Sequence, residues 1–279
     1  LIIFNVYNYI FYSLPIITYR CCSWYIYNLV TLSYKIEDIL SLNNFNLVHL
    51  ETVESTMTEI KKYIGSKNIC MIADEQTSGV GRRGNEWISP KGNIYISFLI
   101  KYNLSIQNHF LFSAFTANSI TEFLNRYINE NINIKWPNDI TINGKKIAGI
   151  MTEIVQKNNI QYIIIGAGIN IFTSPKITDY QTCSLKDFNV NLKYENALID
   201  LIYSYFTEYE MIINKNYNQI LNKFKDKMIQ LGSKITIQLP NGDIRKVLLK
   251  NLNFDGSLLV DEGGKDKDIF SARIISDIN

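Results

Sequence analysis

Histidine is scarce in this sequence, and its cysteines form no paired motif. The 279 residues contain two histidines, His49 and His109, and each lies among apolar neighbours. Both rings are therefore expected in the core or at a sheet edge, which nearly excludes histidine triads and histidine-rich metal sites. The absence of C-x-x-C spacing argues against a structural zinc or a disulfide framework and fits a reducing compartment. The four cysteines are Cys21, Cys22, Cys70 and Cys183.

An excess of one charge sign is also missing. Twenty-eight basic residues stand against 26 acidic ones, which gives a net charge of +2. Because no large basic field is available to hold a polyanion, we expect no nucleic-acid partner. The composition, 47% hydrophobic and 19% charged, is that of a globular protein, and the length suits one large or two modest domains.

The apolar N-terminal stretch lacks the marks of a membrane span and of a signal peptide. Arg20 is the only charge before Lys35, but asparagines, tyrosines and Pro15 interrupt the run. A transmembrane helix needs about 18 nearly uninterrupted apolar residues, and a signal peptide needs a basic start and a small-residue cleavage site. We assign 1–43 to an extension and leave open a poorly ordered segment or gene-model remnant, part of an organelle leader, or a membrane or packed segment. The expected localisation is cytoplasmic, or a plastid or mitochondrion if the extension belongs to a leader.

Strand and helix patterns alternate through the central region, which we define as a domain over 44–230. Helical periodicity marks 105–127 and 194–227, and apolar runs predict strands at 45–51, 68–74, 93–102, 132–139 and 161–171. This order of elements predicts an α+β domain with a mixed or largely antiparallel sheet.

Local signals refine that pattern. Thr56 and Glu59 form a T-x-x-E capping box for a short helix near 56–65. Asn143-Gly144 is a strong hairpin turn, and Pro137 must stop the fourth strand or place it at an edge. From 231 to 279 short strands alternate with turn signals, which predicts a small β-barrel domain.

The loop between Ser78 and Trp87 contains GVGRRG, which matches the G-x-G-x-x-G pattern of dinucleotide-binding proteins. That fingerprint requires a helix to start inside its glycines, because the helix N-terminus receives the pyrophosphate. The residues after Gly84 include a proline and a glycine and lack helical periodicity. The loop instead offers two guanidiniums, Arg82 and Arg83, whose planar forks match carboxylate and phosphate oxygens.

Four further motifs accompany this loop, and each alone is a weak signal. They are ESTMTE (54–59), KWPND (135–139), KKIAG (145–149) and GAGIN (166–170). Together and in this order, over about residues 45–275, the five motifs resemble the biotin protein ligase family. The resemblance implies a catalytic domain of the biotin/lipoate ligase type followed by a small C-terminal SH3-like β-barrel.

The activity implied by the resemblance has two steps. Biotin attacks ATP to give biotinyl-5′-AMP and pyrophosphate, and a lysine of a biotin carboxyl carrier domain then takes the biotinyl group. The carrier would belong to acetyl-CoA carboxylase or another biotin-dependent carboxylase. ATP and Mg²⁺ are the implied cofactors, biotin is the substrate, and a homodimer is left open. The metal would be held through ATP, since the sequence has no clustered ligands for it.

Site residues follow from the resemblance position by position. The chemistry must hold a carboxylate and a triphosphate together against their repulsion, so cationic side chains are required. The implied catalytic residues are Arg82, Lys146 and Asp139, whereas Lys145 is expected to be a solvated neighbour. The implied biotin contacts are Ser55, Thr56, Gln76, Gly79, Val80, Gly81, Arg82, Trp87, Lys146, Gly149 and Gly166. The implied ATP contacts are Arg82, Arg83, Lys135, Asn138, Asp139, Asn170 and Arg273, and Gly84 completes the glycines that let the loop close. Trp136 is expected to pack on the nucleotide ring or on the sheet.

The sequence departs from the family pattern in three places. Val80 replaces the first arginine of the loop, which removes a cation that helps to retain the adenylate. Met57 and Thr58 stand where asparagine and glutamine are usual, at the polar edge of the pocket. The N-terminal residues are too few and too apolar for the helix-turn-helix domain of some bacterial members, so no transcriptional role is expected.

Two other functions compete with this interpretation. A lipoate ligase or octanoyltransferase acting on a lipoyl domain shares the fold, but its arginine- and glycine-rich motif is absent. A degenerate carrier-binding protein is the alternative without catalysis, and the intact Arg82, Lys146 and Asp139 argue against it.

Overall fold

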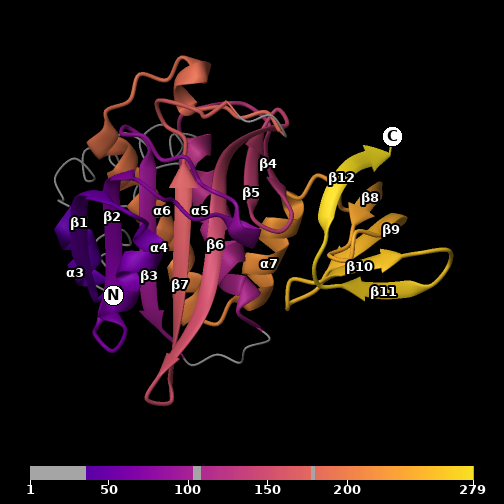
Figure 1. Cartoon of the computed structure of the whole chain (residues 1–279), viewed down its shortest axis with the longest axis horizontal. Helices are drawn as coiled ribbons and strands as arrows, with labels where there is room; N and C mark the ends of the chain where they lie inside the picture. The colour runs from indigo at the N-terminus through magenta and orange to yellow at the C-terminus, as the bar shows by residue number, and fades with distance from the viewer. Residues whose placement is uncertain (1–35, 103–107, 177–179, 279) are drawn as a thin grey trace, which may run out of the picture.

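The computed structural model describes residues 36–102, 108–176 and 180–278, which are built around two β-sheets (Figure 1). The larger sheet has the order β1-β2-β3-β7-β6-β5-β4. Its first two strands run parallel and the other neighbours are antiparallel, so the sheet is mixed and the α+β prediction is confirmed. The strands are β1 (Phe45–Val53), β2 (Asn68–Gln76), β3 (Ile94–Lys101), β4 (Ile132–Lys135), β5 (Asp139–Ile142), β6 (Lys145–Lys157) and β7 (Ile160–Ile169).

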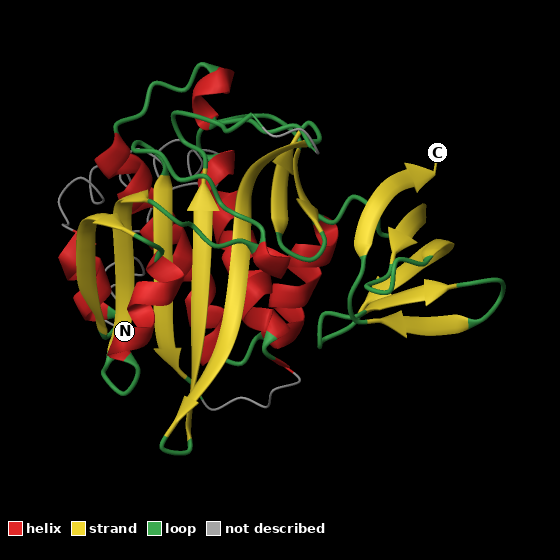
Figure 2. Cartoon of the chain, in the orientation of Figure 1, coloured by secondary structure: helices red, strands yellow, loops and turns green. Residues whose placement is uncertain are grey.

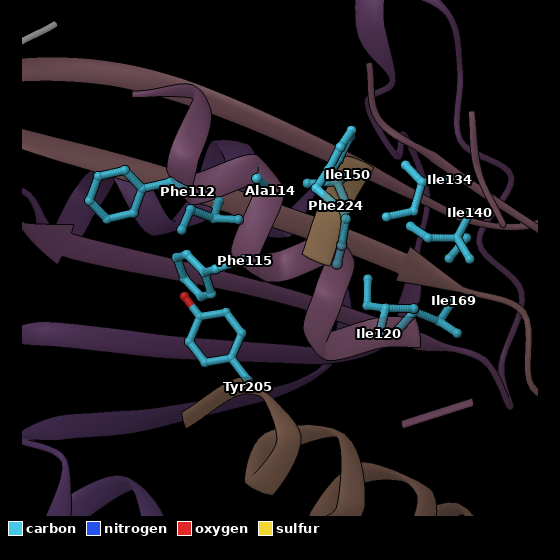
Figure 3. Packing of buried hydrophobic residues seen from close by; sticks show 14 of the residues in the cluster. Phe112, Ala114, Phe115, Ile120, Ile134, Ile140, Ile150, Ile169, Tyr205 and Phe224 are labelled. Atoms are coloured by element: carbon cyan, nitrogen blue, oxygen red, sulfur yellow. The ribbon is translucent and has the colours of Figure 1, made fainter. Parts of the chain in front are cut away.

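The helices that cover one face of this sheet include α5 (Phe110–Asn125), α6 (Tyr194–Ile213) and α7 (Tyr217–Asp226) (Figure 2). Figure 3 shows Phe112 and Phe115 of α5 beside Tyr205 of α6, and the rings of Phe115 and Tyr205 meet edge to face at 5.1 Å. The helical region predicted at 194–227 is thus two helices. The break between them includes Lys215, which has a φ of 57°.

The opposite face carries a smaller apolar cluster under α4 (Thr56–Glu59) and the following 3-10 turn η2 (Ile60–Tyr63). Met57 and Ile60 pack here against β2, β3 and β7. Central strands are therefore buried on both faces, which explains why β3 reads as an almost unbroken apolar run.

The predicted capping box is wrong. Ser55, with extended backbone angles, is the N-cap residue of α4, and Thr56 is already helical. The Thr56 hydroxyl instead donates to Gln76 Oε1, and Glu59 pairs with Lys62. Gln76 on β2 thus accepts a hydrogen bond from the hydroxyl that the motif assigned to capping.

The described fold begins before residue 43, within the predicted N-terminal extension. Residues Ile36–Leu42 form α3, and Leu40 is completely buried in the main core. Apolar residues spaced three and four apart place one side of this short helix on the domain. The rest of the proposed extension, 1–35, lies outside the described residues. Among the described residues, the structure contains no helix with the length and hydropathy of a membrane span.

The second sheet has the order β11-β10-β9-β8-β12 and is antiparallel throughout. It packs beside the larger domain, where Trp136 Nε1 donates to the carbonyl of Gly256 at 2.9 Å. Trp136 is buried, so it packs between protein elements. The strands are β8 (Lys234–Gln238), β9 (Ile244–Leu252), β10 (Leu258–Asp261), β11 (Asp266–Ile269) and β12 (Arg273–Ile278).

Candidate functional site

A pocket opens where β6 and β7 meet the start of α4 and the glycine-rich loop. Most of the residues predicted to contact biotin lie around it. The lining consists of Ser55, Thr56, Met57, Gln76, Val80, Gly81, Arg82, Trp87, Asn138, Lys146, Gly149, Ile150, Met151, Gly166, Ala167 and Gly168.

The floor of the pocket is bare sheet backbone. Gly149 of β6 and Gly168 of β7 are directly paired, and the Trp87 ring lies against both. A Cβ atom at Gly168 would lie 2.3 Å from Trp87 Nε1, and one at Gly149 would lie 3.0 Å from Trp87 Cζ3. Gly166 is covered in the same way by Met57, whose sulfur would be 2.5 Å from an added Cβ. These glycines are therefore required by the side chains that form the walls.

A hydrogen-bonded network fixes the uncharged polar end of the pocket. Gln76 Oε1 accepts from the backbone N–H of Thr56 at 2.8 Å and from its hydroxyl at 3.0 Å. Ser97 donates to the Thr56 hydroxyl, and Gln76 Nε2 donates to Ser89. The hydroxyl of Ser55 is buried and makes no hydrogen bond with the described residues. It can therefore bind a ligand without breaking an existing bond.

The charged end is built around Lys146 of β6. Its ammonium forms an ion pair with Asp139 at 2.8 Å and lies over the Trp87 ring, 5.0 Å from the centroid. Lys146 is mostly shielded, with 15% of its side chain exposed. The neighbouring Lys145 is exposed, in agreement with the prediction that it is solvated.

Arg82 contributes a second cation from the glycine-rich loop. Its Nη1 donates to Asn138 Oδ1 at 3.0 Å, and Asn138 Nδ2 donates to the carbonyl of Ile150, so β6 holds the asparagine amide in place. Burial lowers the pKa of Arg82, Arg83 lowers it further, and Asp139 opposes the shift. Arginine stays protonated despite such a shift. Two cations against one carboxylate leave this end positive, which suits a carboxylate or phosphate.

The loop itself closes through its own backbone. Gly81 donates to the carbonyl of Asn85 at 2.7 Å, and Trp87 donates to the carbonyl of Gly79 at 2.8 Å. Arg82–Gly84 form a single 3-10 turn, η3, with Arg83 at a φ of 58°. A single turn is too short to be the helix whose N-terminus binds the pyrophosphate in a dinucleotide site. The structure therefore agrees with the exclusion of the G-x-G-x-x-G fingerprint.

Several predicted residues lie away from the pocket lining. Asp139 lies next to the lining, where it forms an ion pair with Lys146. Gly79 lies inside the loop, and an added Cβ there would be 2.3 Å from the carbonyl oxygen of Trp87. Arg83 turns toward the second sheet and donates to Ser271. Arg273 is exposed at the start of β12 in that sheet.

Two residues of the predicted nucleotide site also lie apart from the lining. Lys135 pairs in register with Asp139 at the end of the β4–β5 hairpin and is partly exposed. Asn170 is 2% exposed, and its Nδ2 donates to the carbonyl of Cys183 at 3.0 Å. In the structure its amide therefore fixes the loop after β7.

Part of the pocket lining was not predicted from the sequence. Ile150, Met151, Ala167 and Gly168 were not selected, and Met57 was noted only as a departure from the family pattern. Strand periodicity could have found two of them, because Met151 and Gly168 lie two positions from Gly149 and Gly166 and share their face. Thr58, the other departure, is exposed.

Residues 50–170 match the Biotin/lipoate A/B protein ligase family. The bifunctional ligase/repressor BirA of Bacillus subtilis is 24% identical over 81% of this chain and 71% of its own length. The biotin–[acetyl-CoA-carboxylase] ligase of Mycobacterium tuberculosis is 25% identical over 71% of this chain and 74% of its own.

Solved structures agree with this assignment. The Aquifex aeolicus biotin protein ligase, solved with biotin and ATP, superposes with a TM-score of 0.68 at 24% identity, over 82% of this chain and 99% of that one. The Leishmania major biotin protein ligase, solved with biotinyl-5-AMP, gives 0.54 at 27% identity, over 81% and 99%. The family match, the curated relatives and the shared fold all indicate a biotin protein ligase.

Proposed function

We propose that this chain attaches biotin to a lysine of a carboxylase carrier protein, using ATP and passing through biotinyl-5′-AMP. The observation that carries the proposal is the polarity of the pocket. One end offers the uncharged Ser55 hydroxyl and the Gln76 network, and the other gathers Lys146 and Arg82 around a single carboxylate. Biotin has the same polarity, with a neutral ureido ring at one end and a carboxylate at the other.

In the first step the biotin carboxylate oxygen attacks the α-phosphorus of ATP. The bond from this phosphorus to the bridging oxygen breaks, and its electron pair leaves with pyrophosphate. Both reactants are anionic, so Lys146 and Arg82 lower the barrier by neutralising oxygens that carry growing charge. In the second step the neutral amine of the carrier lysine attacks the acyl carbon. The bond from this carbon to the phosphate oxygen breaks, AMP leaves with its electron pair, and the amine releases a proton to solvent.

Magnesium fits this site as an ion carried by the nucleotide. No group of three or more potential metal ligands is found among residues 36–102, 108–176 and 180–278. Mg²⁺ commonly binds through one or two carboxylates together with substrate phosphates, and Asp139 is a carboxylate beside the phosphate-binding cations. The ion would supply charge neutralisation on the phosphates.

The proposed partner is the carrier domain of acetyl-CoA carboxylase or another biotin-dependent carboxylase. A homodimer and the lack of a nucleic-acid partner stay predictions. A reducing compartment, cytoplasmic or organellar, also stays a prediction. The two cysteines in the described ranges, Cys70 and Cys183, are free and buried. Burial raises the pKa of Cys183 to about 11, which keeps this thiol protonated and inert.

Incubation of the protein with a purified biotin carboxyl carrier domain, biotin and Mg-ATP tests the proposal. We expect a streptavidin-reactive carrier, and no label on a carrier whose acceptor lysine is replaced by arginine. ATP–pyrophosphate exchange with biotin or with lipoate then separates the biotin ligase from a lipoate ligase. Exchange with lipoate alone would reassign the substrate, and no exchange with either acid would favour a carrier-binding protein without catalysis.

A further inference from the structure

The chain after β7 returns to Lys146 and is bonded to its backbone. The amide of Lys146 donates to the carbonyl of Gln181, and the amide of Cys183 donates to the carbonyl of Lys146, both at 2.9 Å. The buried Asn170 holds the carbonyl of Cys183 from the other side. Residues 180–183 therefore lie alongside the start of β6 in a fixed register.

Tyr180, at the beginning of this segment, meets the side chain of the same lysine. Its ring centroid lies 5.2 Å from Lys146 Nζ, and the Trp87 ring centroid lies 5.0 Å away. The two rings come from different loops, Trp87 from the glycine-rich loop and Tyr180 from the loop after β7. Beneath them, an added Cβ at Gly149 would lie 3.3 Å from Lys146 Cε, so the lysine chain lies directly on the sheet.

Aromatic rings hold a cation in a way that suits a group that must bind anions. The negative face of each ring attracts the ammonium but takes none of its N–H groups as a full hydrogen-bond donor. A second carboxylate in place of a ring would give the group a net negative charge and compete with the incoming carboxylate and phosphate. With one carboxylate, Asp139, and two rings around it, Lys146 is restrained and still has N–H donors to offer to an anion.

We propose that Tyr180 is a positioning residue for Lys146, and that its ring, together with that of Trp87, holds the ammonium at the pocket for adenylate formation. This inference rests on the proposed function, because it assigns Tyr180 a part in the first step of that reaction. The ring is the essential element, since the hydroxyl is not needed for contact with the cation. Replacement of Tyr180 by phenylalanine should therefore preserve the positioning of Lys146, and replacement by leucine should impair it.

Single-turnover formation of biotinyl-AMP by Tyr180→Leu and Tyr180→Phe tests the proposal. We expect Tyr180→Leu to lower the rate constant by about two- to thirtyfold, the equivalent of about 0.5–2 kcal/mol for a cation–π contact. The KM for biotin should change little, and Tyr180→Phe should stay within about twofold of the native rate. A native rate in Tyr180→Leu, or an equal loss in both variants, would overturn the proposal.

A matched control is available on α6. Arg126 lies 5.4 Å from the ring centroid of Tyr203 and 3.9 Å from the carboxylate of Asp200, a similar arrangement outside the pocket lining. Tyr203→Leu should alter stability as Tyr180→Leu does and leave the rate of adenylate formation unchanged. A comparable loss of rate in Tyr203→Leu would make the effect of Tyr180→Leu a general loss of structure and refute a positioning role.

A spectroscopic measurement keeps this test separate from the proposed function. In lysine-labelled protein, the Lys146 ε-methylene signal should be shifted upfield by the ring currents of Trp87 and Tyr180. Tyr180→Leu should remove part of this shift and Tyr180→Phe should keep it. If the native protein makes no biotinyl-AMP, the proposed function fails. The ring-current shift then tests by itself whether Tyr180 positions Lys146. An unchanged shift in Tyr180→Leu would overturn the positioning role.

Discussion

Gly168 provides the sharpest test of the pocket geometry, because a single methyl group added there meets the wall of the site. In Gly168→Ala the new Cβ would lie 2.3 Å from Trp87 Nε1, 2.4 Å from Cε2 and 2.8 Å from Cζ2. Non-bonded carbon contacts are optimal near 3.5–4.0 Å, so the ring must retreat by about 1 Å or more. Strand β7 cannot yield, since Gly168 is paired with Gly149 on one side and Tyr95 on the other.

The expected consequence is a displaced Trp87 in an otherwise folded protein. Overpacking costs about 1–3 kcal/mol when the surroundings are rigid, but Trp87 lies on a loop and can move. We therefore expect a stability loss near the lower limit, about 1 kcal/mol, which corresponds to a fall in Tm of about 2–4 °C for a domain of this size. The displaced ring also leaves Lys146 and reshapes the pocket, so biotin affinity should fall by about tenfold or more, about 1.4 kcal/mol.

Thermal melts and calorimetric titration with biotin measure the two effects, and a double-mutant cycle assigns their cause. In a Trp87→Ala background the clash has no partner, so adding Gly168→Ala should cost little further stability or affinity. If Gly168→Ala binds biotin with native affinity, the close packing of Trp87 on β7 does not shape the site. If the methyl costs as much without the tryptophan, the damage lies in the sheet and the reasoning about Trp87 is refuted.

Three further predictions address the charged end, the loop and the buried hydroxyl. Lys146→Gln should slow adenylate formation by about ten- to hundredfold, because contacts to charged groups contribute about 1.5–3 kcal/mol, while Tm changes little; a native single-turnover rate would make the assignment of Lys146 wrong. Val80→Arg restores the cation missing from the loop, so labelled biotinyl-AMP should escape more slowly than from the native protein, and biotin with ATP should protect 78–86 from protease; equal escape and equal cleavage would make Val80 neutral and the loop static. Ser55→Ala removes a buried hydroxyl that has no partner in the described structure, so Tm should be kept or rise while biotin affinity falls about five- to tenfold; a fall in Tm with unchanged affinity would contradict a ligand-binding role.

Features set by neighbouring residues could be read from the sequence alone. The Asn143-Gly144 turn has φ values of 50° and 78° at its central positions, the left-handed backbone that this pair adopts readily, and it joins β5 to β6 as predicted. The apolar runs of β2, β3 and β7 also became strands, because a strand buried on both faces needs apolar residues throughout. The ordered motifs identified the family, since five short patterns in one order constrain a chain far more than each does separately.

Contacts between distant parts of the chain decided the hydrogen-bond partners of residues whose local sequence pattern allowed more than one role. Thr56 begins a capping motif in sequence, but β2 brings Gln76 to its hydroxyl, and this part-buried hydrogen bond replaces the cap. Asn170, at a glycine-rich strand end, is buried and its Nδ2 donates to the carbonyl of Cys183, while its predicted contact with ATP stays a prediction. The local sequence pattern indicates which roles a residue can have. The partner that the fold places beside the residue then decides which of these roles it takes.

The geometry of the site itself was decided only by the tertiary structure. Gly149 and Gly168 are 19 positions apart, and their alignment under Trp87 depends on the register between β6 and β7. Lys146 receives Tyr180 and Trp87 from loops on either side of it in the sequence, and no spacing in the chain encodes that meeting. The sequence determined which chemical groups the protein carries, because composition and local motifs are written along the chain. Strand pairing determined which groups face one another, because that choice is made by the packing of the whole sheet.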